Sequence, residues 1–109
     1  MKNILFICSR NKLRSPTAES IFCDREGWSV RSAGLANDAE VLLSAEDLEW
    51  ADIIFVMESV HRRKLSEKFG RVLKGQRVIC LDIPDDYEFM DNRLVRLLEQ
   101  KVPALVGQV

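Results

Sequence analysis

Hydrophobic residues in this chain gather in short unbroken runs, and these runs alternate with segments in which apolar residues recur at helical spacing. The unbroken runs are rich in β-branched and aromatic residues, a composition that favours buried strands. The predicted strands span residues 3–7, 28–33, 53–57 and 77–81. The predicted helices span residues 16–26, 45–51, 59–69 and 92–102. This alternation predicts an α/β fold with a four-stranded parallel sheet, covered by helices on both faces.

Individual residues predict where some of these helices begin and end. Ser15 is expected to cap the first helix, with Pro16 at its first position, where a missing N–H removes no hydrogen bond. Asp91 is expected to cap the last helix, and Pro103 is expected to end it. The basic run at residues 61–64 lies on the third helix and is interpreted as a solvated face.

Length and composition are those of one compact domain over residues 1–109. With 47% hydrophobic residues, a chain of this length can bury a sizeable core. Its 16 basic and 17 acidic residues give a net charge of -1. This balance excludes the uniformly basic surface of a non-specific nucleic-acid binder and the high net charge of a disordered chain. The charge balance therefore gives no reason to expect a nucleic acid as a partner. No apolar run is long enough for a membrane span, so a membrane is not expected as a partner either.

The spacing of the cysteines and of the single histidine argues against a structural zinc site. Cys8, Cys23 and Cys80 form neither a Cys-x-x-Cys pair nor a ligand set with His61. Three cysteines also cannot complete a disulfide framework, so reduced thiols in the cytoplasm are expected. Cys23 and Cys80 are interpreted as core thiols.

The polar loop after the first predicted strand carries the clearest chemistry in the sequence. It runs from Cys8 to Ser15 and reads Cys-Ser-Arg-Asn-Lys-Leu-Arg-Ser. In parallel α/β sheets, ligands bind beyond the carboxyl ends of strands, where backbone N–H groups and the dipole of the next helix attract anions. The loop is therefore predicted to bind phosphate. The residues predicted to do so are Ser9, Arg10, Asn11, Lys12, Leu13, Arg14 and Ser15.

Several side chains of this loop suit phosphoryl transfer. The positive field that holds phosphate also favours a thiolate, so Cys8 is predicted to be a nucleophile. Arg14 can hold two phosphoryl oxygens at once, and Ser15 can hydrogen-bond the thiolate. Asn11 tolerates the left-handed backbone that a tight loop often requires. The same pattern also fits a simpler interpretation, in which Cys8 is a core thiol and Arg14 a solvated charge.

At these residues the sequence resembles the low-molecular-weight protein tyrosine phosphatases, whose signature after a strand is Cys, five residues, Arg, Ser and usually Pro. Residues 4–16 match it, and the likeness continues at residues 31–34 and 51–57. The resemblance implies a short, divergent member with a single-domain, three-layer sandwich of the phosphatase I type. It also implies hydrolysis of phosphotyrosine through a phosphocysteine, without a metal or other cofactor. The residues themselves imply only an accessible phosphomonoester.

Two loop positions depart from the family pattern. Arg10 stands where a glycine is usual, and its positive side chain favours a more highly charged phosphate. Leu13 stands where a second cysteine is expected. The disulfide that commonly shields the nucleophile from oxidation is therefore not available to this chain.

The family also has a general acid, an Asp followed by Pro and an aromatic residue, which this chain would carry on the loop after the fourth predicted strand. Residues 82–91 of this chain hold five acidic residues and no basic one. Asp85 matches the acid and Tyr87 the aromatic residue, whereas Asp86 replaces the proline. Asp85 is the first choice for the general acid and Asp86 the second. Tyr87 is interpreted either as a wall for the substrate ring or as an anchor of the loop on the core.

Three other functions compete with a cysteine-dependent phosphatase. A phosphocarrier similar to the IIB subunits of sugar phosphotransferase systems also has a cysteine after its first strand, but it needs neither Arg14 nor Asp85. A thiol-coupled arsenate reductase needs a resolving pair of cysteines near the third strand, and residues 53–60 contain none. A phosphate-binding domain with little activity is the third alternative.

Overall fold

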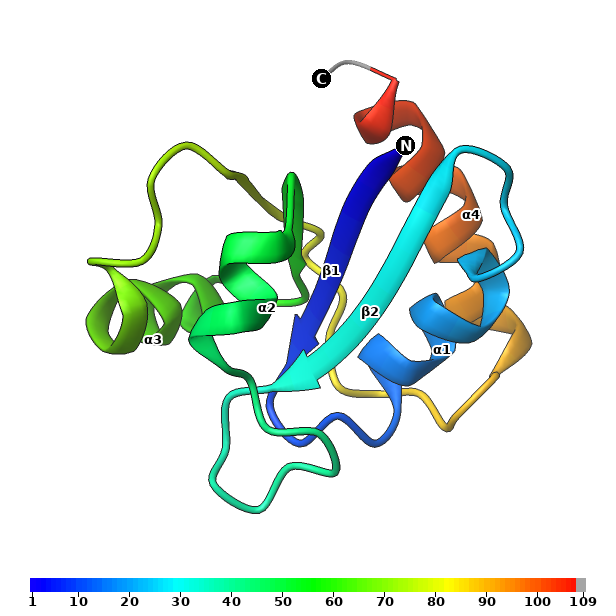
Figure 1. Ribbon diagram of the computed structural model, residues 1–109. Coiled ribbons are helices and arrows are strands. Elements are labelled where there is room, and N and C mark those ends of the chain that lie inside the picture. The colour runs from blue at the N-terminus through cyan, green and yellow to red at the C-terminus, as the bar shows by residue number, and fades with distance from the viewer. Residues whose placement is uncertain (108–109) are drawn as a thin grey trace.

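The computed structural model describes residues 1–107 as a sheet between two layers of helices (Figure 1). The strands are β1 (Lys2–Cys8), β2 (Trp28–Gly34), β3 (Ile53–Val56) and β4 (Arg77–Cys80). The helices are α1 (Arg14–Phe22), α2 (Ala45–Trp50), α3 (Ser59–Phe69) and α4 (Asn92–Val106). All neighbouring strands are parallel, so the predicted α/β fold with a four-stranded parallel sheet is confirmed.

The order of the strands places a change of direction at the centre of the sheet. The order is β2-β1-β3-β4. The chain passes from β1 to β2 on one side and then crosses to β3 on the other side of β1. The carboxyl ends of β1 and β3 therefore border a crevice, which is the usual ligand site of such sheets. Cys8, the last residue of β1, lies at this crevice.

Alternate residues of the central strands are buried against opposite helix layers. Phe6 of β1 and Phe55 of β3 stack on each other in a cluster that includes side chains of α1 and α4. Leu5 and Ile54 lie in a second cluster with side chains of α2 and α3. All four side chains are completely buried, and each contributes about 1.5–3 kcal/mol of apolar transfer free energy. Burial on both faces explains why residues 4–8 of β1 and all of β3 form unbroken apolar runs.

Three predicted helix boundaries are wrong. Helix α1 ends at Phe22 rather than at residue 26, because the chain turns there and the N–H of Arg25 donates to the carbonyl of Phe22 over 3.1 Å. Helix α1 begins at Arg14, with Leu13 rather than Ser15 at the cap position, because the Ser15 side chain bonds within the loop instead. Helix α4 continues through Pro103 to Val106, and the burial of Val102 and Val106 in the core stabilises the helix on both sides of the proline. The prediction that Asp91 caps α4 is confirmed, since its carboxylate accepts a hydrogen bond from the backbone of Arg93.

Three burial predictions also need correction. Cys23 is exposed and is not a core thiol, whereas Cys80 is half-buried and packs only at the edge of the second core cluster. His61 is buried, although the rest of the basic run on α3 is solvated as predicted. No helix within residues 1–107 is long and apolar enough to cross a membrane.

Candidate active site

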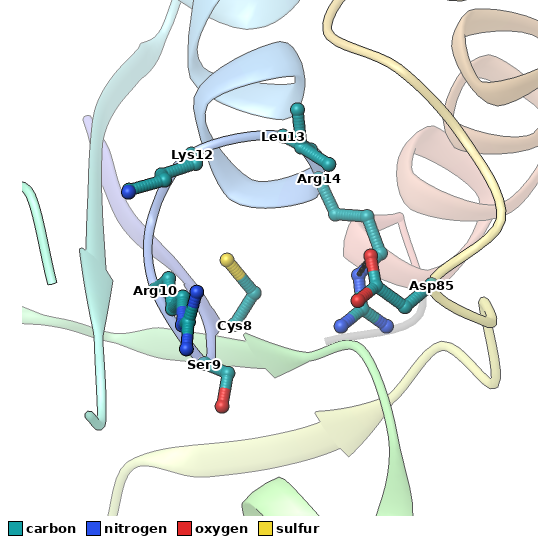
Figure 2. Close-up of a pocket in the computed structure, with 7 residues that line it drawn as sticks. All are labelled: Cys8, Ser9, Arg10, Lys12, Leu13, Arg14 and Asp85. Atoms are coloured by element: carbon teal, nitrogen blue, oxygen red, sulfur yellow. Dashed lines mark ion pairs between the residues drawn. The ribbon is translucent and has the colours of Figure 1, made fainter.

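The backbone between β1 and α1 forms an arc around the sulfur of Cys8 (Figure 2). Cys8 is 3% exposed. Asn11, in the middle of the arc, has a φ of 56°, which is the left-handed conformation expected there. This conformation turns its backbone N–H toward the sulfur, and the N–H donates to Cys8 Sγ over 3.2 Å.

A network of buried hydrogen bonds fixes the loop from beneath. The side-chain amide of Asn11 donates to Ser15 Oγ over 2.9 Å and to Ser32 Oγ over 3.0 Å. Ser32 in turn donates to a carboxylate oxygen of Glu19. Because Ser15 accepts from Asn11, its hydroxyl proton is available to Cys8 Sγ, 2.9 Å away. Two donors therefore point at the sulfur.

Arg14 is a buried cation that residues after β3 and after β4 hold in place. Its side chain is 4% exposed. Nη1 donates to Glu58 Oε2 over 2.8 Å and to the carbonyl of Ile83 over 2.7 Å. Glu58 follows β3 and Ile83 follows β4, so both acceptors lie at the same sheet edge as Cys8. A buried guanidinium with such partners has a fixed orientation, which a solvated surface charge lacks.

Sequence reasoning missed Glu58 as a partner of Arg14. Its position is informative, since it comes directly after the strand that borders β1 on the crevice side. An acidic residue at that point is close enough to an arginine at the start of α1 to form an ion pair. The order of the strands, which the local sequence pattern does not reveal, is needed to see this.

His61 is buried beside Glu58, and this contact explains why it does not belong to the solvated face of α3. Its Nδ1 accepts from the backbone N–H of Glu58 over 3.1 Å, which caps the helix. Its Nε2 lies 3.8 Å from Glu58 Oε2. Burial, and then the charge of Arg14, lower the pKa of His61 from 6.5 to about 4, against the opposing effect of Glu58. His61 is therefore neutral at pH 7.

The neutral state of His61 predicts a loss of stability in acid. Between pH 6.5 and about 4 the unfolded chain binds a proton at this residue and the folded chain does not, so the free energy of unfolding falls as pH drops through this window. The contribution of this group is at most about 3.5 kcal/mol. Urea unfolding across this range should show a shallower pH dependence in His61→Gln than in the wild type. Because the chain has a single histidine, an equal slope in both proteins would refute the assignment.

The loop after β4 brings Asp85 to the site and leaves Asp86 and Tyr87 outside it. Asp85 Oδ1 lies 3.8 Å from Arg14 Nε, and the two side chains face each other in Figure 2. Asp86 is exposed and does not line the pocket. Tyr87 packs against the core, with the guanidinium of Arg93 5.3 Å from its ring centre. Of the two interpretations of Tyr87, this placement favours the anchor.

The site contains a cavity of about 360 Å³, and the lining of this cavity is strongly positive. Its lining residues are Cys8, Ser9, Arg10, Lys12, Leu13, Arg14 and Asp85. Asn11 and Ser15 are also predicted to bind phosphate. Their side chains lie beneath the loop, and the two residues donate hydrogen bonds that orient the sulfur. Arg10 forms an exposed ion pair with Asp38, 3.6 Å away. Within residues 1–107 no cluster of His, Cys, Asp or Glu could hold a metal ion.

Gly34, at the end of β2, allows the neighbouring loop to approach the arc closely. A Cβ at this position would lie 2.6 Å from the carbonyl oxygen of Ser9 and 3.0 Å from the backbone nitrogen of Asn11. The residues after Gly34 then hydrogen-bond along the arc, from Ala36 to Ser9 over 2.8 Å and from Glu40 to Arg10 over 3.0 Å. The absence of a side chain at Gly34 is thus needed for the packing that shapes the site.

The chain is similar in sequence to the protein-arginine-phosphatase of Bacillus subtilis (strain 168). The two are 30% identical over 63% of this chain and 64% of that protein. The chain thus spans about 64% of the length of this curated relative. The sequence matches no protein-family model.

Solved structures of phosphatases share the fold. The low-molecular-weight protein tyrosine phosphatase of Streptococcus pyogenes has a TM-score of 0.80 and 16% identity, covering 100% of this chain and 93% of that one. The YwlE arginine phosphatase of Geobacillus stearothermophilus has a TM-score of 0.77 and 21% identity, covering 99% and 95%. A cysteine-to-serine mutant of YwlE arginine phosphatase, with a phosphorylated active-site serine, has a TM-score of 0.73 and 24% identity, covering 95% of each chain. These neighbours confirm the resemblance seen in the sequence, at the level of the fold.

Proposed function

We propose, on the premise that this chain has the fold of the low-molecular-weight protein tyrosine phosphatases, that residues 1–109 form one domain that hydrolyses phosphomonoesters through a phosphocysteine on Cys8. The observation that carries this proposal is the convergence of Cys8, Arg14 and Asp85 on one cavity. The three residues come from β1, from α1 and from the loop after β4, so only the folded chain brings them together. The three cysteines of the domain are free thiols, which suits the reducing conditions of the cytoplasm.

The first step transfers the phosphoryl group to sulfur. The thiolate of Cys8 attacks phosphorus, and the S–P bond forms as the bond from phosphorus to the substrate oxygen breaks. Arg14 is held through Nη1, which leaves its Nε and Nη2 groups to bind two phosphoryl oxygens. The amides of the loop bind the remaining charge. Positioning and electrostatic stabilisation therefore carry the catalysis.

Asp85 supplies the proton that the first step requires and removes one in the second step. Its protonated carboxyl gives a proton to the departing substrate oxygen, which leaves as an alcohol. The resulting carboxylate then takes a proton from water, and the oxygen of that water attacks phosphorus. The S–P bond breaks, phosphate leaves, and the thiolate of Cys8 returns to its two donors, Asn11 and Ser15.

Phosphotyrosine in a protein is the substrate class that we propose. The B. subtilis relative is an arginine phosphatase and the S. pyogenes neighbour a tyrosine phosphatase, so the comparisons offer both. Arg10, Lys12 and Arg14 line the cavity of this chain, against the single acid Asp85. An excess of positive charge repels the guanidinium of phosphoarginine and attracts a dianionic aryl phosphate.

Replacing the proposed acid tests this mechanism with a matched control. In the absence of added metal, Asp85→Asn should lower kcat for a phosphotyrosine peptide by about 10²-fold or more. The loss should be smaller for para-nitrophenyl phosphate, because its leaving group departs without a proton. Asp86→Asn removes a neighbouring carboxyl that does not line the cavity and should change kcat only a few-fold.

Other outcomes of the same assay favour the competing functions. A larger loss in Asp86→Asn than in Asp85→Asn would assign the acid to Asp86. Wild-type protein that hydrolyses neither substrate would overturn the phosphatase. If such protein nevertheless accepted and kept a phosphoryl group on Cys8, the phosphocarrier would take its place.

A further inference from the structure

Exposed hydrophobic side chains gather beside the candidate active site. Apart from Met1, the large hydrophobic residues that are exposed within residues 1–107 are Val41, Leu42, Phe89 and Met90. Their exposed fractions are 52%, 53%, 51% and 41%. The first pair follows β2, and the second ends the loop after β4, so all four belong to the two segments that flank the phosphate loop. Exposed apolar clusters on a folded domain are typical of binding surfaces.

Val41 and Phe89 both line a second hollow that adjoins the first. The hollow is also lined by Pro16 and by the loop residues Asn11 and Lys12. Lys12 lines both hollows. In Figure 2 its side chain leaves the loop on the side opposite to Arg14 and Asp85. A molecule bound at Cys8 therefore reaches the second hollow by passing Lys12.

Hydrogen bonds hold both walls of the second hollow in place. On one wall the N–H of Glu40 donates to the carbonyl of Arg10 over 3.0 Å, and that of Gly34 donates to the carbonyl of Val41 over 2.8 Å. On the other wall the N–H of Met90 donates to Thr17 Oγ1 over 3.0 Å. A hollow fixed in this way is formed before a ligand arrives, which lowers the entropic cost of binding.

We infer that this hollow is a subsite for an apolar side chain next to the phosphorylated residue of a polypeptide substrate. The inference rests on the proposed function and specifies its substrate. A small phosphomonoester fills only the cavity of Cys8, whereas successive residues of a polypeptide, about 3.8 Å apart at their Cα atoms, extend into the adjoining hollow. Glu19 and Glu40 also line it, so an apolar neighbour is accepted there and an acidic neighbour is repelled.

A set of phosphotyrosine peptides tests the subsite. The reference peptide has alanine at every position around phosphotyrosine, and the others carry one leucine or one glutamate at each neighbouring position in turn. With the wild-type protein, leucine at one position should raise kcat/KM about tenfold over alanine, the gain expected for burial of about half of a leucine side chain. Glutamate at that position should lower kcat/KM.

Variants then locate the effect on the protein. The ratio of kcat/KM for the best leucine peptide to that for the alanine peptide should fall toward one in Phe89→Ala and in Val41→Ala. Met90→Ala and Leu42→Ala are matched controls, because these exposed neighbours do not line the hollow, and they should keep the wild-type ratio. Since the ratio compares two substrates of one protein, a loss of folded protein cancels.

Two failures are distinguishable. If the wild type hydrolyses the alanine peptide but leucine has no effect at any position, or if the controls lose the ratio as fully as Phe89→Ala, the subsite is refuted and the phosphatase stands. If the wild type hydrolyses neither the peptides nor para-nitrophenyl phosphate, the proposed function fails and the subsite fails with it.

Discussion

Cys8→Ser is expected to lower turnover of aryl phosphates by at least about 10⁴-fold while the protein stays folded. A serine hydroxyl is not ionised at neutral pH, and the groups around the Cys8 sulfur cannot activate it. Asn11 contributes an N–H and Ser15 an O–H, so both neighbours donate hydrogen bonds and neither is a base. The rate for para-nitrophenyl phosphate and the midpoint of urea unfolding together check this expectation.

The other two cysteines provide controls for this variant. Cys23 is exposed and Cys80 half-buried, and neither lines the cavity. Cys23→Ser and Cys80→Ser should therefore keep the wild-type rate. Turnover that persists in Cys8→Ser at more than a hundredth of the wild-type rate would show that another group is the nucleophile.

Arg14→Lys should reduce kcat/KM by about 10³-fold, although it preserves the charge. A lysine ammonium is a point charge and cannot at once bond Glu58, the carbonyl of Ile83 and two phosphoryl oxygens, as the fork of a guanidinium does. Most of the loss should appear in kcat, because the oxygens bear more charge in the transition state. Steady-state kinetics with a phosphotyrosine peptide give both parameters.

Arg10→Lys is the matched control for the Arg14 variant. Arg10 lines the same cavity, but it is exposed and its ion pair is with Asp38 at the surface. Exposed pairs contribute little, so this variant should lose less than about tenfold in kcat/KM. Equal losses in the two variants would mean that only the net charge of the loop matters and that the buried geometry of Arg14 does not.

The sheet and the phosphate loop were predictable because their signals are local. A segment buried on both faces of a sheet has no polar residue to interrupt it, as residues 4–8 of β1 and all of β3 show. The loop from Cys8 to Arg14 lies between such a strand and a helix, so the positions of Cys8 and Arg14 follow from the chain itself. Asp85 was found through the family pattern and the rule that parallel strands end at one edge.

The supporting contacts were not predictable because they join segments that only the folded chain brings together. Glu58 binds Arg14 across 44 positions of sequence, and Met90 binds Thr17 across 73. His61 lies in a run of basic residues and looks solvated, but the turn at the start of α3 directs its ring inward. Ser15 looks like a helix cap, whereas the fold uses its hydroxyl at the sulfur.

The most direct test of phosphoryl transfer to Cys8 is rapid quenching of the reaction with radiolabelled para-nitrophenyl phosphate, followed by mapping of the labelled peptide. Asp85→Asn is the protein to use, because its first step needs no acid with this leaving group while its second step lacks the base. The label should accumulate on the peptide that contains Cys8, together with a burst of about one equivalent of para-nitrophenolate. Continued turnover with no label on that peptide, or with label on another residue, would contradict the mechanism.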